Sequence, residues 1–166
     1  AIMVLTNVIT WDDLISNKAA FDVLIWFSSL VAMASGLQKV GVLTWIGTNT
    51  QEMLSGLSPT ALIISLLVLF FILHYLFASV TAHVTALIPI FMAIAINLLT
   101  PEQIVPFTII LAGSLGVMGI ITPYATGPSP IWYGAGYISQ GRWWALGAIF
   151  GALYLGVIIL GALIVI

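Results

Sequence analysis

One stretch of the chain restricts its possible folds more than any other: between Pro59 and Leu99 there is no Asp, Glu, Lys or Arg. A soluble domain carries about 25% charged residues, whereas this chain as a whole carries 5%, with 62% hydrophobic residues. A surface of that composition is stable only in lipid, where a spanning helix needs about 20 largely apolar residues. The sequence therefore predicts an all-α integral membrane protein whose main partner is the lipid bilayer.

The uncharged stretch is interrupted at its middle by the polar residues Ser79, Thr81 and His83. No polar loop separates two full spans here, so two shorter helices that meet at a polar tip inside the membrane fit better. Non-helical backbone at membrane depth is tolerated only where it is buried in protein or lines a cavity. Residues 59–99 are therefore predicted to form a re-entrant helical hairpin beside a binding cavity.

A second interruption follows the hairpin. After a loop at residues 100–103, an apolar run begins near Pro106 and breaks at residues 122–130, where three prolines remove amide donors and prevent a continuous helix. Pro130 suits the first turn of a second half-helix, which resumes through residues 131–138. The sequence predicts a discontinuous helix in this part of the chain.

Other segments precede the hairpin. A first complete span is predicted from Ala19 to Leu37, with Asp22 in its first turn, where it can pair with Lys18 and complement the helix dipole. The stretch from Val40 to Leu57 is too polar to span, and it is predicted to lie along the membrane interface. The chain starts at Ala1, and its first residues look like the tail of a helix, so we expect it to be a piece of something longer.

A final span is predicted from Trp143 to Ile166. Glycines spaced along this segment would keep one flank of the helix thin and allow close packing against neighbouring helices. They are Gly147, Gly151, Gly156 and Gly161.

Both interruptions could build a substrate site. Each leaves the amides of a half-helix free, with a partial positive charge that suits a carboxylate, and secondary transporters use such breaks at the bilayer midplane. The hydroxyls of Ser79, Thr81, Thr122 and Thr126 add uncharged donors, and neither break contains Arg or Lys. These hydroxyls could instead bond only to carbonyls of their own helix, but their gathering at two independent breaks favours binding.

Two histidines lie on either side of the hairpin tip. A histidine inside a membrane segment is a functional candidate. His83, in the first turn of the second hairpin helix, could offer an imidazole donor or a protonated charge to the substrate. A hydrogen-bonded packing role fits His74 equally well, because it lies a full turn before the tip.

Other functional classes are disfavoured. No His, Asp or Glu cluster has metal-ligand spacing and no nucleophile has an acid–base partner, so an enzyme is not expected. With three cations there is no basic patch for nucleic acid. No organic cofactor is expected.

The two interruptions resemble one known family. The tip HYLFASVTAH at residues 74–83 and the break ITPYATGP at residues 121–128, followed by YGAGY at residues 133–137, resemble the divalent anion:sodium symporter (DASS) family. The similarity is greatest to its branch of bacterial citrate/succinate and tartrate/succinate antiporters and plastid 2-oxoglutarate/malate translocators. The resemblance extends over nearly the whole chain.

This resemblance implies an architecture. Members have about twice this length, in two inverted repeats that each contain a re-entrant hairpin and a broken helix, and this chain would be the second repeat. Its partners would be the N-terminal repeat of the same protein and a second copy in a homodimer, with an elevator-type movement of the hairpin-containing domain. The segments would then be residues 1–58 on the scaffold side, the hairpin at 59–99, the discontinuous helix at 100–140 and the last helix at 141–166.

The resemblance also implies roles for particular residues. The family's tip usually reads Ser-Asn-Thr, and here valine replaces the asparagine, whose amide helps to bind sodium in the symporters. A valine side chain offers no oxygen, and a hard cation needs several, so we expect a sodium-independent exchanger with His83 partly replacing the cation. The candidate substrate-binding residues are Ser79, Val80, Thr81, His83, Thr122, Pro123 and Thr126.

Alternatives remain at this point. The protein could be a sodium-coupled dicarboxylate symporter in which the backbone carbonyls of Tyr75, Ala78 and Ile121 bind the ion, or, in another class, a channel or a structural membrane subunit. The substrate could be malate, succinate, tartrate, citrate or 2-oxoglutarate. The membrane would be a bacterial inner membrane or, alternatively, a plastid inner envelope.

Overall fold

The computed structural model describes the backbone of residues 2–165 and most of their side chains. Every regular element in this range is a helix, so the predicted all-α class is confirmed. Four of the described helical segments are long and apolar enough to cross a membrane, at residues 59–76, 80–98, 101–120 and 140–165. The side chains outside the described set are Ala19, Asp22, Val23, Trp26, Phe27, Leu30, Val31, Ala34, Gln38 and Leu43.

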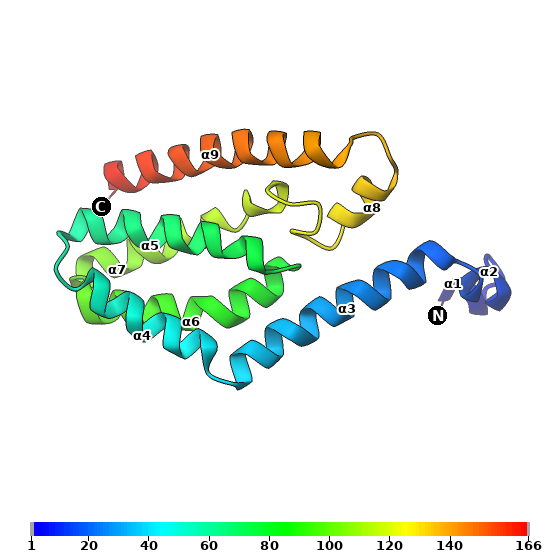
Figure 1. The fold of residues 1–166 in the computed structure, drawn as a ribbon, viewed down its shortest axis with the longest axis horizontal. Helices are drawn as coiled ribbons and strands as arrows, with labels where there is room; N and C mark the ends of the chain where they lie inside the picture. The colour runs from blue at the N-terminus through cyan, green and yellow to red at the C-terminus, as the bar shows by residue number, and fades with distance from the viewer. Residues whose placement is uncertain (1, 166) are drawn as a thin grey trace.

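The N-terminal part reaches away from the helical bundle. Two short helices, α1 (Ile2–Leu5) and α2 (Trp11–Ile15), precede the long helix α3 (Lys18–Lys39), which leads to the bundle (Figure 1). The helix predicted from Ala19 to Leu37 is therefore present. Its predicted pairing between Asp22 and Lys18 lies outside the described residues.

Helix α4 (Val42–Leu54) packs along the bundle. Gly47 lies against Ile90 of the neighbouring helix so closely that a side chain at this position would collide with it. Thirteen residues rise about 20 Å, which is too short for a hydrocarbon core of about 30 Å. The predicted inability of this segment to span is consistent with that length, and its place at the membrane interface stays a prediction.

The hairpin is present as two antiparallel helices that lie side by side (Figure 1). Helix α5 (Pro59–Leu73) continues as a 3-10 turn, η1 (His74–Leu76), and α6 (Val80–Leu98) returns from the tip. Ser58 caps α5 by accepting a hydrogen bond from the Ala61 amide, and Ser79 caps α6 in the same way from Ala82. Polar caps at both starts explain where the two helices begin.

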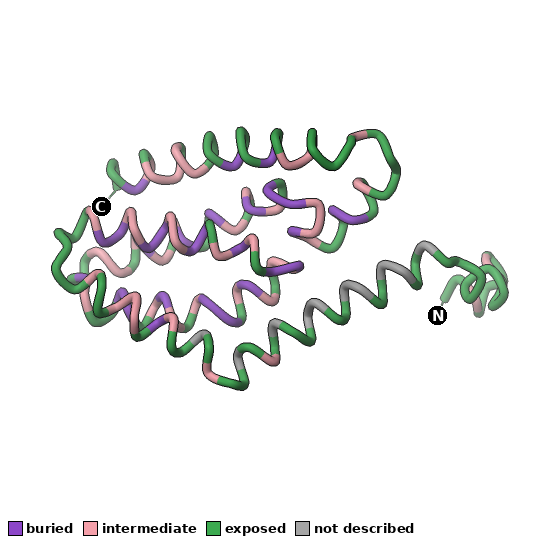
Figure 2. Tube along the Cα trace, viewed as in Figure 1, coloured by how far each residue is buried: buried purple, intermediate pink, exposed green. Residues whose placement is uncertain are grey.

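Large apolar side chains hold the two arms of the hairpin together. Those on facing sides are fully or almost fully buried, and the buried positions follow the inner faces of the helices (Figure 2). They include Leu66, Leu67, Phe70, Leu87, Phe91 and Ile94.

The hairpin arms are longer than predicted. With η1, the first arm has 18 residues and the second has 19, so each rises about 27–29 Å and could by itself cross a membrane. The prediction of two short arms is therefore wrong in length, because η1 continues the helical path almost to the tip. The depth of the tip in a bilayer, and so the re-entrant character of the hairpin, stays a prediction.

The discontinuous helix is also present, with different ends from those predicted. It consists of α7 (Pro101–Ser114), a 3-10 turn η2 (Met118–Ile120) and α8 (Ser129–Gly134). The predicted loop at residues 100–103 is wrong, because Thr100 and Gln103 form a capping box that starts α7.

The helix unwinds at Ser114, before the first proline of the break. The amides of residues 115–117 each donate to the carbonyl three residues earlier, so the α-helical pattern gives way to narrower 3-10 turns beside Gly113 and Gly116. Helix α8 stops at Gly134 rather than continuing through Ile138, because Gly136 adopts a left-handed conformation with φ of 79° that ends the helix.

Helix α9 (Gln140–Val165) covers α5, α7 and η2 (Figure 1). At Gly147 an added Cβ would lie 2.7 Å from the carbonyl oxygen of Ile121, and at Gly151 it would lie 3.0 Å from the Ile121 side chain. At Gly156 and Gly161 it would meet nothing within 4 Å among the residues that the structure describes. The predicted packing role is therefore confirmed for the first two glycines and stays a prediction for the last two.

Replacement of Gly147 with Ala should destabilise the protein, because the methyl group meets backbone that cannot rotate away. Overpacking of this kind costs about 1–3 kcal/mol. Gly156→Ala is the matched control on the same helix, and it should be neutral or slightly stabilising, since alanine favours a helix by up to about 1 kcal/mol over glycine. Thermal unfolding of the full-length protein carrying this sequence, in detergent, measures both. Equal melting temperatures for the two variants would contradict the packing seen at Gly147.

Candidate functional site

The two interruptions, which lie far apart in the sequence, meet in the structure. The Nε2 atom of His74 lies 3.1 Å from the carbonyl oxygen of Ala125, and the hydroxyl of Tyr124 donates to the carbonyl of Tyr75 over 3.1 Å. A carbonyl can only accept, so Nε2 of His74 is the protonated nitrogen. The end of the first hairpin arm and the loop of the broken helix therefore form one junction.

The hairpin tip presents donors at the surface. Ser79 and Val80 are partly exposed and Thr81 is exposed. The first amides of a helix have no partner within it, and the Ser79 hydroxyl is bonded only to the third of them, at Ala82. Because α6 has 19 residues and no acidic residue in its first turn, this end is suited to a carboxylate.

The loop of the broken helix uses most of its hydroxyls internally. Thr122 is fully buried, and its oxygen accepts a hydrogen bond from the Tyr124 amide. The hydroxyls of Thr126 and Ser129 lie 2.8 Å apart, and that of Ser129 donates to the Gly119 carbonyl. Pro123 and Thr126 are partly exposed, whereas Thr122 faces the interior.

His83 lies inside the hairpin rather than at its surface. The ring is fully buried, and its centre lies 4.3 Å from that of Phe70, 4.8 Å from that of His74 and 5.1 Å from that of Phe77. The Phe70 backbone lies near the ring, and among the described residues neither ring nitrogen has a partner with hydrogen-bond geometry. Contact between His83 and a substrate would require the tip to rearrange, so the predicted donor role stays a prediction.

Sequence reasoning missed the aromatic side chains that complete the junction. Trp144 of α9 stacks on Tyr75, with ring centres 6.1 Å apart and an angle of 13° between the rings, and it meets Tyr124 edge-on at 6.2 Å. Tyr124 lies within the ITPYATGP segment, so the motif in the sequence could have pointed to it. No such motif pointed to Trp144, because nothing in the sequence links α9 to the hairpin tip.

The carbonyls considered for a sodium ion have other neighbours. That of Tyr75 accepts the bond from Tyr124, and that of Ile121 is turned towards Gly147 of α9. Ala78 is buried at the tip. Within the described part of the chain, no group of three or more His, Cys, Asp or Glu side chains could hold a metal ion. The junction thus offers uncharged donors and no cluster of acidic ligands.

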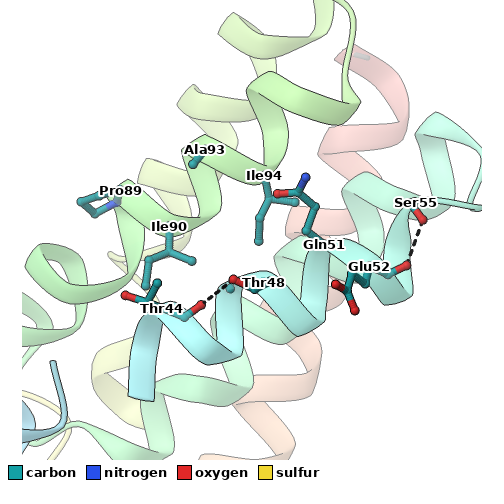
Figure 3. Close-up of a pocket in the computed structure, with 10 residues that line it drawn as sticks. Thr44, Thr48, Gln51, Glu52, Ser55, Pro89, Ile90, Ala93 and Ile94 are labelled. Carbon is teal, nitrogen blue, oxygen red and sulfur yellow. Dashed lines mark hydrogen bonds between the residues drawn. The ribbon is translucent and has the colours of Figure 1, made fainter. Parts of the chain in front are cut away.

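A separate groove of about 520 Å³ lies between α4 and α6 (Figure 3). Helix α4 lines it with polar side chains, whereas α6 contributes Pro89 and apolar residues. None of the candidate substrate-binding residues lines this groove. The polar residues that line the groove are Thr44, Thr48, Gln51 and Glu52 on α4, with Ser55 directly after its end.

Comparison with known proteins decides the family. A family model described as the sodium:sulfate symporter transmembrane region matches residues 1–165. The chain belongs to this family. It is 45% identical over 165 residues to proteins named L-tartrate/succinate antiporter from Escherichia coli K12, Shigella sonnei and Shigella flexneri. The match covers 99% of the chain and 34% of each relative, so the chain spans about a third of their length. The prediction that members have about twice the length of this chain is therefore wrong, because these relatives are about three times as long.

The resemblance to the divalent anion:sodium symporters is thereby confirmed. The chain is an integral membrane protein with apolar helices. The names of its relatives agree with the prediction of a transporter rather than an enzyme. Within this symporter family, the relatives at 45% identity are antiporters by name.

The two buried histidines should respond oppositely to the same substitution. His83→Leu removes two ring nitrogens that have no hydrogen-bond partner among the described residues, whereas His74→Leu leaves the buried Ala125 carbonyl without its donor. An unpaired buried polar group costs about 1–3 kcal/mol. In thermal unfolding of the full-length protein, His83→Leu should therefore melt above the wild type and His74→Leu below it. The reverse order would show that the pairing at the junction is not as described.

Proposed function

We propose that this chain forms part of a secondary active transporter that exchanges small dicarboxylates or tricarboxylates across a bacterial inner membrane. The observation that carries the proposal is the meeting of the polar hairpin tip with the loop of the broken helix, in a chain that is 45% identical to tartrate/succinate antiporters. A carboxylate of the substrate binds at the exposed start of α6, where Thr81 and the free amides supply donors. Malate, succinate, tartrate, citrate and 2-oxoglutarate are the candidate substrates.

Exchange fits the junction better than sodium coupling. Val80 supplies no side-chain oxygen at the tip, and the Tyr75 carbonyl already accepts a hydrogen bond. The water ligands of a sodium ion must be replaced by several protein oxygens, and the Tyr75 carbonyl has only one lone pair left for such a role. Outgoing carboxylate would then drive the uptake of incoming carboxylate, without a co-transported cation at this site.

The architecture proposed with this function follows the family. The chain lies within the second of two inverted repeats, because about a third of a relative's length is less than one of two repeats. The hairpin is re-entrant, and the hairpin and broken helix move together against a scaffold in a homodimer. The remaining half of the substrate site comes from the N-terminal repeat. A plastid inner envelope is the alternative location, and the organisms of the matching relatives favour the bacterial membrane.

A sodium-coupled dicarboxylate symporter is the second candidate function. It is favoured by the description of the family model, which names sodium symport. In that case the ion would be held by the backbone carbonyls of Ala78 and Ile121, with the second lone pair of the Tyr75 carbonyl.

Liposomes that contain the full-length protein separate the two candidates. Labelled succinate or tartrate should enter only when the liposomes contain dicarboxylate, and the rate should be the same in sodium and in potassium. Uptake into empty liposomes that requires a sodium gradient would establish the symporter instead. Absence of dicarboxylate uptake under every condition would reject both.

One pair of variants tests the site itself. Thr81→Val removes an exposed hydroxyl at the tip and should raise KM for the dicarboxylate by about tenfold or more, since a hydrogen bond to a charged group contributes about 1.5–3 kcal/mol. Thr85→Val, one turn further along α6, is the matched control, because its hydroxyl donates to the Thr81 carbonyl of its own helix. Equal KM values for the two variants would remove Thr81 from the site.

A further inference from the structure

Two hydrogen bonds cross the junction in opposite directions. His74 of the hairpin donates to Ala125 of the broken-helix loop, and Tyr124 of that loop donates to Tyr75 of the hairpin. The partners are sequence neighbours on both sides, so the two bonds act on one short length of backbone in each segment. Such a reciprocal pair fixes both the separation and the twist of the two segments.

The half of the junction formed by His74 and Ala125 is shielded from water, which strengthens its effect. His74 and Ala125 have no exposed surface, so breaking their bond leaves a buried donor and a buried carbonyl without partners. The ring of Tyr124 is held edge-on by Trp144, which also stacks on Tyr75. The hydroxyl of Tyr124 is therefore directed at its acceptor by packing as well as by the bond itself.

Both proposed substrate-binding segments are attached directly to this junction. Ser79 at the tip follows Tyr75 by four residues, and Pro123 immediately precedes Tyr124. A shift of the loop against the hairpin would change the distance between donors that must contact one small ligand. Ligand contacts are sensitive to displacements of this kind, because a hydrogen bond weakens quickly outside its normal range of about 2.7–3.2 Å.

We propose that His74 and Tyr124 are positioning residues, which set the relative position of the hairpin tip and the broken-helix loop and thereby the affinity for the carboxylate substrate. The inference rests on the proposed function. Neither side chain need touch the substrate: His74 is fully enclosed, and the Tyr124 hydroxyl is engaged with the hairpin backbone. Their loss should therefore change KM more than the maximal rate of exchange.

The first test is Tyr124→Phe in the full-length protein, reconstituted in liposomes loaded with dicarboxylate. This change keeps the ring beside Trp144 and removes only the hydroxyl. KM for labelled succinate should rise about three- to tenfold, in line with the loss of one hydrogen bond, and the maximal rate per folded protein should stay near that of the wild type. Tyr154→Phe is the control, because its hydroxyl makes no hydrogen bond with the described residues.

The second test uses two amide side chains of different reach at residue 74. In His74→Gln the amide nitrogen can occupy the place of Nε2 and donate to Ala125, whereas in His74→Asn it lies near the place of Nδ1, which has no partner. Glutamine should keep KM within about twofold of the wild type, and asparagine should raise it as Tyr124→Phe does. A role limited to filling space would not separate the two amides in this direction.

The outcomes distinguish this inference from the function on which it rests. If the wild type exchanges dicarboxylates and Tyr124→Phe keeps the wild-type KM, the positioning role is wrong and the proposed function stands. A fall in maximal rate that matches a loss of folded protein, with KM unchanged, would likewise reduce both residues to a purely structural role. If the wild type exchanges no dicarboxylate, the proposed function fails and the inference fails with it.

Discussion

Backbone that leaves a helix inside an apolar bundle has no water to bond with, and this constraint shapes the part of the chain where the site lies. The hairpin tip and the broken-helix loop both leave carbonyls without helical partners. Each segment supplies a donor to a carbonyl of the other, because His74 and Tyr124 donate across the junction. Ser129 meets a further carbonyl, that of Gly119, from the start of α8. These three side chains thus satisfy backbone carbonyls within the fold itself, before any ligand is considered.

Sequence reasoning located the elements well where one residue type dominates the local energetics. The prolines between residues 122 and 130 cannot continue a helix, and the break is there. The earlier unwinding at Ser114 was not predicted, because glycines such as Gly113 and Gly116 are common in membrane helices and do not by themselves end one. The predicted length of the hairpin arms was wrong for a related reason. The composition of η1 does not distinguish it from a loop or from the end of α5.

The residue types of the candidate site could be predicted from the sequence, but the direction in which each side chain points could be predicted less well. Ser79 and Thr81 lie at the surface of the tip as a helix start requires, but Thr122 and His83 point inward. On a helix that is buried on most sides, the direction of a side chain depends on its neighbours, here the rings of Phe70 and others. The hydrophobic periodicity of the sequence does not identify these neighbours. Contacts between segments about 50 residues apart, such as Tyr124 with Tyr75, were equally invisible.

The close approach of Gly147 to the carbonyls of Ile120 and Ile121 has a consequence for biosynthesis. Helix α9 is made after the hairpin and the broken helix, and it supplies both the glycine surface and the indole of Trp144 that cover the loop. Until α9 leaves the ribosome and enters the bilayer, one side of that loop faces the insertion machinery or lipid without its cover. The junction between the hairpin and the broken helix is therefore completed late, and a ribosome that stalls within α9 would leave the loop without this cover.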